Sequence, residues 1–305
     1  MKKIKLKIPA TTANFGSGFD VLGASLKLYN EIRISEVGSG KSEVEIAIEG
    51  EGKDTLPRNE TNIVYQAMKK VFDICKKPLP TYRLLLTNNI PLARGLGSSA
   101  AARLGGLVAA NILCGGKLSD DEIICIATHL EGHPDNVVPS FSGGLCVCNY
   151  NGKNNIKYTN FKMPDDLKAV LCIPDFEVST DMARKILPKK VLHKDAVFNL
   201  SCVALFVLAI VQKKYDLVSV AMEDKLHQPY RKKLIPGMDD VFKSAKSAGA
   251  YGVCISGSGP TILAVTSAPR ASAAGAAMRK AFSKHKIKSS YVVCDFDNKG
   301  IITGN

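Results

Sequence analysis

The sequence predicts an α+β fold with two lobes, and three observations support this class. Segments in which every second residue is apolar, as in strands, are interspersed with segments whose apolar residues recur every three or four positions, as in helices. The chain has 305 residues, 46% of them hydrophobic, which is enough for one large domain or two modest ones. A new series of strand and helix patterns begins near Lys162. We therefore expect an N-terminal domain over residues 1–160 and a C-terminal domain over residues 161–305.

Five strands are predicted in the N-terminal domain. Apolar and charged residues alternate over residues 4–8, which favours a strand with one face exposed to water. A signal peptide would instead need a continuous apolar segment. Residues 43–48 alternate strictly, with Val44, Ile46 and Ile48 apolar. The other strands are predicted over residues 31–36, 82–86 and 144–149.

Three helices are predicted between these strands. Residues 62–75 place their apolar side chains on one helical face. Residues 99–114 are followed by two glycines, which favour the left-handed conformation that ends many helices. Ser119 and Glu122 form the spacing of a capping box, which predicts the start of the third helix.

The C-terminal domain shows shorter patterns. Its predicted helices cover residues 181–187 and 198–212, with a further helix before residue 251. Its predicted strands cover residues 169–173, 251–256, 260–265 and, as the last strand, 290–295. The longest uninterrupted apolar run, residues 202–211, is too short to span a bilayer, so neither a transmembrane helix nor a membrane partner is expected.

Composition narrows the class of protein. Nine cysteines, an odd number, without a secretion signal indicate a reducing compartment, so we expect a cytoplasmic protein. Cys146 and Cys148 would face the same side of a strand, but no second Cys/His pair has the spacing of a metal site, which favours core packing. The net charge is +13, but aromatic and basic residues are not interleaved as they are in nucleic-acid-binding segments. This favours a solvated basic surface over a nucleic-acid partner.

Residues 90–102 connect a predicted strand to a predicted helix and form the most informative segment. Gly95 and Gly97 allow a tight turn and close approach to a ligand, and Ser98 and Ser99 follow at the helix start. The free N–H groups and the dipole of a helix N-terminus favour a phosphate there. The segment is neither a Walker A loop nor a G-x-G-x-x-G loop. The alternative is an ordinary helix start capped by serine.

The spacing Pro-x-x-x-Gly-Leu-Gly-Ser-Ser-Ala over residues 91–100 resembles the phosphate loop of the GHMP kinases, a superfamily that includes galactokinase and mevalonate kinase. Two further motifs, at residues 9–20 and 256–261, lie where this superfamily has its own. The resemblance implies a two-lobed GHMP kinase fold. The N-terminal lobe would have the phosphate loop at a helix N-terminus, and the C-terminal lobe would be ferredoxin-like.

Three other segments resemble the homoserine kinases within this superfamily. Residues 131–139 read Glu-Gly-His-Pro-Asp-Asn-Val-Val-Pro, and similar agreement occurs at residues 179–188 and 227–231. The resemblance implies an enzyme of threonine biosynthesis that transfers the γ-phosphate of ATP to the side-chain hydroxyl of L-homoserine. Homodimers are frequent in the family, although no segment of the sequence identifies an interface.

The resemblance also implies which residues bind each ligand. For ATP they are Asn62, beside the adenine, and the loop residues Pro91, Arg94, Gly95, Leu96, Gly97, Ser98, Ser99, Ala100 and Ala101. For Mg²⁺ they are Glu131 with Ser98 or Ser99, because Mg²⁺ prefers oxygen ligands together with phosphates. For the acceptor they are Asn14, Asp20, His133, Asp135, Thr180, Arg184, Arg231 and Gly257.

The charges of homoserine suggest partners within this set. The guanidinium groups of Arg184 and Arg231 suit its carboxylate, and Asp20 or Asp135 suits its ammonium group. The expected catalytic residues are Asn14, Asp20, His133 and Asp135. Asn14 and His133 would position the hydroxyl. No dedicated base is expected, so Asp135→Asn should impair acceptor binding more than turnover.

Each assignment has a structural alternative. Asn14 is also suited to an Asx turn, and either arginine to a surface ion pair. For the whole chain three functional alternatives remain. They are a GHMP kinase with another small hydroxylated acceptor, a non-catalytic nucleotide or metabolite binder, and a basic nucleic-acid-binding protein.

Overall fold

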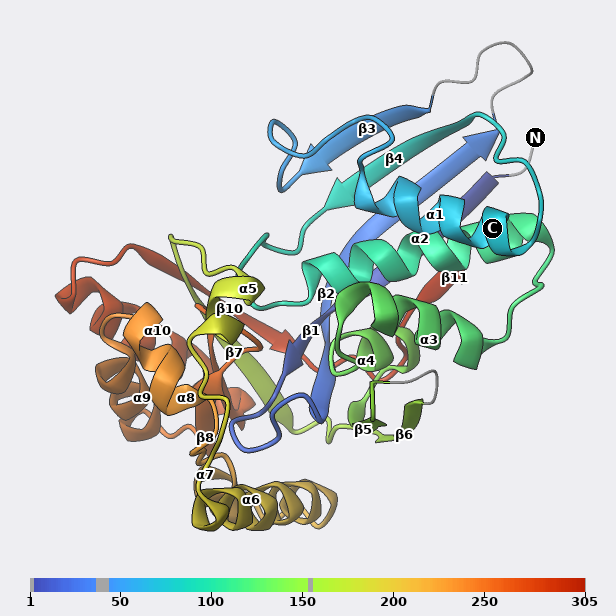
Figure 1. The fold of residues 1–305 in the computed structure, drawn as a ribbon. Coiled ribbons are helices and arrows are strands. Elements are labelled where there is room, and N and C mark those ends of the chain that lie inside the picture. The colour runs from blue at the N-terminus through green and yellow to red at the C-terminus, as the bar shows by residue number, and fades with distance from the viewer. Residues whose placement is uncertain (1–2, 37–43, 153–155, 305) are drawn as a thin grey trace.

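Two β-sheets form the framework of the protein. The computed structural model describes residues 3–36, 44–152 and 156–304. The larger sheet and its helices occupy one side of the molecule and the smaller sheet with its helices the other (Figure 1). The long strands β1 and β2 reach from the first part towards the second (Figure 1).

The first sheet has seven strands in the order β11-β1-β2-β4-β3, and β5 and β6 join it through β2. Only the β3–β4 pair is parallel among the described pairs. The strands span Lys3–Ala13 (β1), Leu22–Glu36 (β2), Glu45–Gly50 (β3), Tyr82–Asn88 (β4), Leu145–Tyr150 (β5), Ile156–Phe161 (β6) and Ile302–Gly304 (β11). The alternation along β1 buries Leu6 and Ile8 fully.

The described residues of the first part form four helices. Helix α2 packs on β1 and β2, and α1 packs on α2, so the glycine loop before α2 is fixed to the sheet. The predicted capping box is confirmed: Ser119 accepts from the backbone of Glu122, whose side chain accepts in return. The helices span Ile63–Ile74 (α1), Ser98–Cys114 (α2), Asp120–Glu131 (α3) and Val137–Ser142 (α4).

The second sheet has four antiparallel strands in the order β10-β7-β9-β8. They span Leu167–Pro174 (β7), Gly252–Ile255 (β8), Ile262–Ser267 (β9) and Ser289–Asp295 (β10). Helix α10, Ala268–Lys284, connects β9 to β10 and packs on the sheet beside α9. This β-α-β-β-α-β order is ferredoxin-like, as predicted.

The connection from β7 to β8 consists of short helices around one long one. The long helix is α6, His193–Val211. The others are α5 (Thr180–Lys185), η1 (Tyr215–Leu217), α7 (Val218–Ala221), α8 (Gln228–Arg231), η2 (Lys232–Leu234) and α9 (Met238–Ser247). Helices α5 and α8 hold residues of two predicted acceptor segments.

The predicted α+β class and the predicted elements are confirmed, with several additions. The structure adds β6, α4, α10 and the first half of β2, none of which the sequence patterns revealed. The prediction that the strand at residues 290–295 is the last one was wrong, because β11 follows it and pairs with β1. Glu43 of one predicted strand lies outside the described residues.

The two sheets divide the chain between β6 and β7, close to the expected domain boundary. Strand β11 is the exception, because residues near the C-terminus return to the first sheet. The division at residues 160 and 161 therefore stays a prediction. Cys146 and Cys148 are buried on β5.

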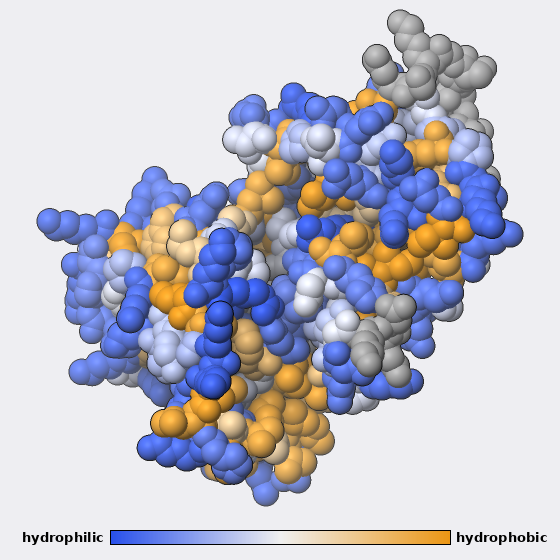
Figure 2. Space-filling view, viewed as in Figure 1, coloured by the Kyte–Doolittle hydropathy of each residue, from blue (hydrophilic) through white to orange (hydrophobic). Residues whose placement is uncertain are grey.

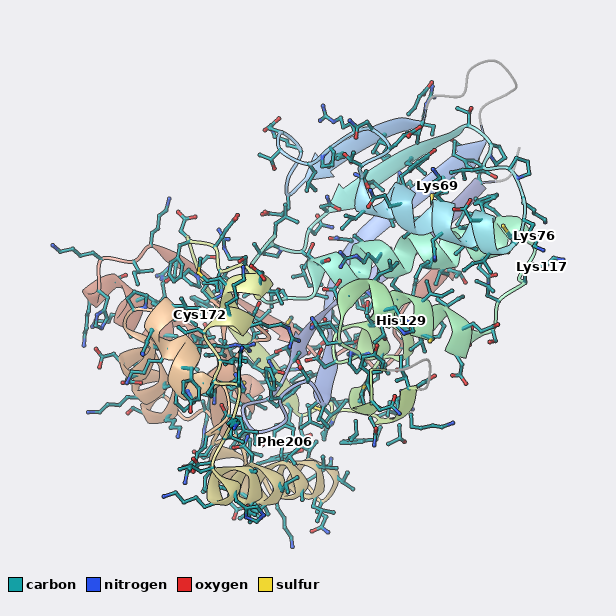
Figure 3. The ribbon with its side chains drawn as sticks, viewed as in Figure 1. Lys69, Lys76, Lys117, His129, Cys172 and Phe206 are labelled. Atoms are coloured by element: carbon teal, nitrogen blue, oxygen red, sulfur yellow. The ribbon has the colours of Figure 1, made fainter. Side chains whose placement is uncertain are left out.

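Helix α6 is unusually apolar. Among the described residues it is the one helix long and apolar enough to cross a membrane by length and composition. Its inner face packs against the rest of the chain: Phe206 is fully buried and its ring centre lies 5.1 Å from that of Phe15 (Figure 3). Only 28% of its most apolar 18-residue window is buried, so much of its other face is exposed.

Candidate active site

A cavity of about 310 Å³ lies where the predicted glycine motifs meet. It is lined from both parts of the molecule. From the predicted set it brings together Asn14, Asp20, Pro91, Arg94, Gly95, Leu96, Gly97, Ser98, Ser99, Glu131, His133, Asp135, Thr180, Arg184, Arg231 and Gly257. Residues predicted separately for phosphate, metal and acceptor thus share one cavity.

Hydrogen bonds join the three motifs below the cavity. The hydroxyl of Ser256 donates to the carbonyl of Gly95 over 2.7 Å and lies 2.9 Å from the hydroxyl of Thr12. The side-chain N–H of Asn14 donates to the carbonyl of Gly257 over 2.9 Å. These hydrogen bonds therefore join segments that are 161 to 244 residues apart in the sequence.

Gly95 and Gly97 are required by the shape of the phosphate loop. Both have positive φ, +71° and +69°, which L side chains rarely adopt. A Cβ atom on Gly95 would lie 2.2 Å from the carbonyl oxygen of Ser256, and one on Gly97 would lie 2.0 Å from Oγ1 of Thr11. The loop therefore packs directly on its neighbours, and any side chain at these positions would push it away.

The loop ends at the N-terminus of α2, which faces the cavity. Gly97 is the N-cap residue, and no side chain caps the helix. The first N–H groups of the helix are therefore available to an anion, and the helix dipole favours a negative charge. Arg94 supports the loop from outside, because it donates to the carbonyls of Leu92 and Pro174 and lies 3.3 Å from Glu177.

Glu131 ends α3 beside the first turn of α2. The hydroxyl of Ser99 donates to Oε2 of Glu131 over 3.0 Å. In octahedral Mg²⁺ coordination with bonds of about 2.0–2.1 Å, adjacent oxygens lie about 2.9 Å apart. The spacing of these two oxygens therefore fits ligands of one Mg²⁺, and Ser99 is one of the two serines predicted to bind it.

Arg103 occupies the same corner and was not predicted. Its Nη1 donates to the hydroxyl of Ser99 over 2.6 Å and also forms an ion pair with Glu131. Arg103 lies one helical turn after Ser99 on α2, so the i, i+4 spacing was the available signal. The pair is mostly buried, because the side chains of Arg103 and Glu131 are 27% and 12% exposed.

Asp20 and Arg184, which also line the cavity, form an ion pair. Both oxygens of Asp20 accept from the Arg184 guanidinium, over 2.8 and 2.9 Å. The ring of Phe19 lies beside this pair, 5.7 Å from the guanidinium carbon of Arg184. Burial lowers the pKa of Arg184, but the hydrogen bond and charge of Asp20 outweigh this effect and raise it.

Arg231 is nearly fully buried beside the same ring. It donates to the carbonyls of Ala183 and Gly257, and its guanidinium carbon lies 5.1 Å from the centre of the Phe19 ring. Burial lowers its pKa to about 10. Nδ1 of His227 lies 3.3 Å from Nη1 of Arg231 and accepts from it, since Nε2 of His227 donates to the carbonyl of Gly16 over 2.7 Å.

His133 and Asp135 follow Glu131 and form a close pair. Nδ1 of His133 lies 2.5 Å from Oδ1 of Asp135. Burial lowers the pKa of His133, but the charge and hydrogen bond of Asp135 outweigh it, so the net shift is upward. One polar atom each of Asp20, His133 and Asp135 lie within 4.8 Å of one another. The cavity therefore offers two carboxylates to a cationic group.

Three predicted residues do not line this cavity. The side chain of Asn62 accepts from the backbone of Val64 and donates to the carbonyl of Pro57, so it caps α1. Ala100 and Ala101 are fully buried in α2 and bring no side chain to the cavity. The cavity also contains residues that the sequence did not single out: Ala93, Asn136, Val178, Ser179 and Ser258.

Asn14 stabilises its own loop, but not through the Asx turn of its structural alternative, because its side-chain oxygen accepts from a residue six positions on instead of two. Its backbone has a φ of +74°, and its side-chain oxygen accepts from the N–H of Asp20 over 3.0 Å. The amide therefore closes the glycine loop and fixes Asp20. The same side chain lines the cavity, so a loop-closing contact and a contact with a ligand are compatible.

Comparison with family models gives two matches. A model described as "GHMP kinases N terminal domain" matches residues 62–144. A model described as "GHMP kinases C terminal" matches residues 206–284. Together they cover more than half of the chain and both parts of the fold.

Similar proteins point to one member of this superfamily. The chain is 46% identical to a homoserine kinase of Moorella thermoacetica, over 93% of this chain and 94% of that protein. It is 42% identical to a homoserine kinase of Carboxydothermus hydrogenoformans, over 97% and 95%. A crystal structure of homoserine kinase from Cytophaga hutchinsonii superposes with a TM-score of 0.89 and 32% identity, over 100% of this chain and 98% of that one.

A more distant comparison concerns the fold alone. A mevalonate kinase structure is 17% identical and has a TM-score of 0.72, over 98% of this chain and 100% of that one. The two-sheet architecture is thus shared with a mevalonate kinase.

Proposed function

The chain belongs to the homoserine kinases of the GHMP kinase family, and we propose that its cavity aligns the γ-phosphate of ATP with the side-chain hydroxyl of L-homoserine. The observation that supports this most directly is the arrangement of the cavity. Its lining combines the N-terminus of α2, which we assign to the phosphates, with the charged pair of Asp20 and Arg184, which we assign to the acceptor. The product would be O-phospho-L-homoserine.

At the nucleotide end we assign the phosphates to backbone N–H groups of residues 95–99. Two properties of the loop support this assignment. Gly95 and Gly97 bring the backbone close to its neighbours without side chains in between, and α2 has no side-chain cap to compete with the phosphates. Arg94 would hold the loop in place rather than bind the nucleotide, because its donors are directed to carbonyls of the protein. That Asn62 lies beside the adenine of ATP stays a prediction.

We assign Mg²⁺ to Ser99 and Glu131, whose oxygens have a suitable separation of 3.0 Å. The ion would supply charge stabilisation to the β- and γ-phosphate oxygens. Arg103 already offers a positive charge to both ligands in the described structure. Binding of the ion therefore requires the guanidinium to move away from Glu131. Ser98 also lines the cavity and remains the second candidate ligand.

At the acceptor end an amino acid would replace the contact between Asp20 and Arg184 with its own contacts to the two residues. Its carboxylate would bind Arg184, together with the buried Arg231, and its ammonium group would bind Asp20 or Asp135. Arg231 is preorganised for this role, because two carbonyls and the Phe19 ring fix its guanidinium. Thr180 begins α5 and would contribute its hydroxyl or N–H group to the same carboxylate.

The chemical step needs positioning and charge stabilisation more than covalent help. Asn14 is held by Gly257 and Asp20, and His133 is held by Asp135, so both side chains approach the acceptor from fixed positions. They would orient the hydroxyl towards the γ-phosphate. We assign no general base, and the hydroxyl proton would pass to a phosphate oxygen.

The experiment that tests this function measures ADP release with Mg-ATP and a panel of acceptors: L-homoserine, L-serine, L-threonine, mevalonate and a control without acceptor. Preference for L-homoserine is the expected result. Activity with another acceptor alone would keep the kinase and contradict our assignment of the acceptor end. Protein that is folded and binds ATP but releases no ADP with any acceptor would make the chain a nucleotide or metabolite binder. We propose a cytoplasmic location, consistent with the odd number of cysteines, nine, in the sequence.

A further inference from the structure

Asp224 is a fully buried carboxylate that does not line the active-site cavity. Its Oδ1 accepts from the N–H of Leu226 over 2.8 Å and from the side-chain N–H of Asn199 over 2.7 Å. Its Oδ2 accepts from the N–H groups of His227 and Gln228 over 3.0 and 2.6 Å. A buried charge is costly, and four donors offset this cost. Three of the donors lie at the start of α8, so Asp224 caps that helix from outside it.

Asn199 joins this carboxylate to the glycine loop that follows β1. It is a buried polar residue on the inner face of the apolar helix α6, whose exposed apolar face is the orange area at the lower edge of the molecule (Figure 2). Its side-chain N–H groups donate to Asp224 and to the carbonyl of Ser17, over 2.7 and 3.0 Å. Its oxygen accepts from the N–H of Lys225 over 2.9 Å. The amide thus fixes Asp224 relative to the loop that contains Asp20.

A second connection leads from Asp224 through His227 to Arg231. The backbone N–H of His227 is bound by Asp224, and its ring lies between two partners: Nε2 donates to the carbonyl of Gly16, and Nδ1 accepts from Nη1 of Arg231. The ring of Phe19 stacks on it with centres 5.1 Å apart. Arg231 follows His227 by about one helical turn, so the cap on the first turn also fixes the backbone from which the guanidinium extends.

Arg231 is a buried cation that still has free donors. Its Nε donates to the carbonyl of Ala183, and its Nη1 donates to the carbonyl of Gly257 and to His227. In the described part of the chain its Nη2 has no hydrogen-bond partner and is not enclosed by protein. Within the same residues the guanidinium forms no ion pair, unlike that of Arg184. Because Arg231 lines the cavity, a carboxylate in the cavity would supply both missing contacts.

We propose that Asp224 is a positioning residue for the acceptor carboxylate: it fixes His227 and the first turn of α8, and thereby holds Arg231 with Nη2 free for that carboxylate. The inference rests on the proposed function, in which Arg231 binds the carboxylate of the acceptor. The charge of Asp224 contributes as well. Burial lowers the pKa of Arg231, and Asp224 is one of the carboxylates whose charge opposes this effect.

The preference for L-homoserine over L-homoserine amide, which lacks the carboxylate, tests this role. The preference is the ratio of the two kcat/KM values at saturating Mg-ATP. In Asp224→Asn the new NH₂ group necessarily faces two N–H donors, whichever way the amide is turned, so half of the cap is lost. The preference should fall at least about tenfold, and the KM for ATP should stay within about twofold of the wild type.

Glu223→Gln is the matched control, because it removes the same charge from the exposed neighbouring residue, which lies outside the cavity. It should retain the preference of the wild type. Asn199→Ala is a second, milder variant, which removes one of the four donors to Asp224. It should lower the preference by about threefold, and it provides the test if urea unfolding shows that Asp224→Asn does not fold.

A helix cap that only stabilises the fold would lower the free energy of unfolding and leave the preference unchanged. An unchanged preference in Asp224→Asn and Asn199→Ala, with a wild type that discriminates between the two acceptors, would therefore overturn the role of Asp224 alone. A wild type that phosphorylates neither acceptor, or both equally well, would instead contradict the proposed function on which the inference rests.

Discussion

Arg184 donates a hydrogen bond to each carboxylate oxygen of Asp20, with Nη–Oδ distances of 2.8 and 2.9 Å. Both residues line the cavity. The two residues come from the loop after β1 and from α5, so the pair joins the two parts of the molecule. Both side chains are about one-third exposed, 33% for Asp20 and 37% for Arg184. A zwitterionic amino acid carries one positive and one negative group. It can therefore pair with Asp20 and Arg184 in place of their contact with each other.

Asp20→Asn should therefore weaken acceptor binding without weakening nucleotide binding. A charge-assisted hydrogen bond contributes about 1.5–3 kcal/mol, so the KM for L-homoserine should rise at least about tenfold. The KM for ATP should stay within about twofold of the wild type. Steady-state kinetics with each substrate varied in turn measures both constants.

Asp181→Asn is the matched control for this variant. Asp181 forms an exposed ion pair with Lys185 on the same helix as Arg184, outside the cavity, so its removal should leave both KM values unchanged. An equal rise in the KM for ATP and for L-homoserine in Asp20→Asn would indicate a general loosening of the site instead of a lost contact with the acceptor.

Arg103→Met should lower the concentration of Mg²⁺ that is needed to fill the proposed metal site. The guanidinium binds Ser99 and Glu131, the proposed metal ligands, and competes with the ion for both. Its removal should strengthen Mg²⁺ binding by about fivefold or more, because one of the two competing cations is gone. Calorimetric titration of Mg²⁺ into protein with ADP measures this without turnover.

Arg83→Met is the control for Arg103→Met, because Arg83 forms an exposed ion pair with Glu45 on the first sheet, away from the cavity. It should leave Mg²⁺ binding unchanged. Weaker Mg²⁺ binding in Arg103→Met would contradict the competition and make Arg103 a residue that orients Glu131 for the ion.

Gly97→Ala should destabilise the protein and weaken nucleotide binding. The positive φ of Gly97 costs an alanine about 1–2 kcal/mol, and the added Cβ would lie 2.0 Å from Oγ1 of Thr11. Urea unfolding should therefore show a loss of about 2–4 kcal/mol. Thr11→Ala removes the atom in contact, so Gly97→Ala should cost less in that background than in the wild type. Equal costs in the two backgrounds would show that the contact with Thr11 is unimportant.

The parts of the site that the sequence predicted are those that depend on local chemistry. Gly95 and Gly97 were recognised because a loop that approaches a phosphate needs glycine, and both have the positive φ that this requires. Ser119 and Glu122 were recognised because a capping box is confined to four residues. The segments around Asp20, His133 and Arg184 were recognised by family resemblance, and the fold brings them into one cavity.

What the sequence could not give depends on contacts between distant segments. The hydrogen bonds from Arg184 to Asp20 join residues 164 positions apart, so no local sequence pattern predicts them. Strand β11 is three residues long and exists because it pairs with β1. Helix α10 was missed because its alanine-rich sequence has little difference in polarity between its faces. The role of Asn62 as a cap was hidden because the predicted helix included it.

Acid should destabilise the protein through His227, which is fully buried beside Arg231. Burial lowers its pKa to about 4, from an ordinary value of 6.5. Between these two values the unfolded chain binds a proton that the folded chain does not, so stability falls as the pH decreases. The contribution of His227 is complete above pH 6.5 and is lost as the pH falls through 4, a change of about 3 kcal/mol at most.

His227→Gln separates this effect from that of the other acidic and basic groups. A glutamine retains a donor for the carbonyl of Gly16 and an acceptor for Arg231, but it does not titrate. The free energy of unfolding, measured with urea between pH 7 and pH 4, should fall less steeply in the variant than in the wild type. The pKa of the neighbouring Arg231, about 10, lies far above this range, so Arg231 keeps its charge and the difference between the two curves reports the histidine. Parallel curves would mean that His227 binds its proton equally well in the folded and unfolded chains, and its burial beside Arg231 would then have no energetic consequence at acid pH.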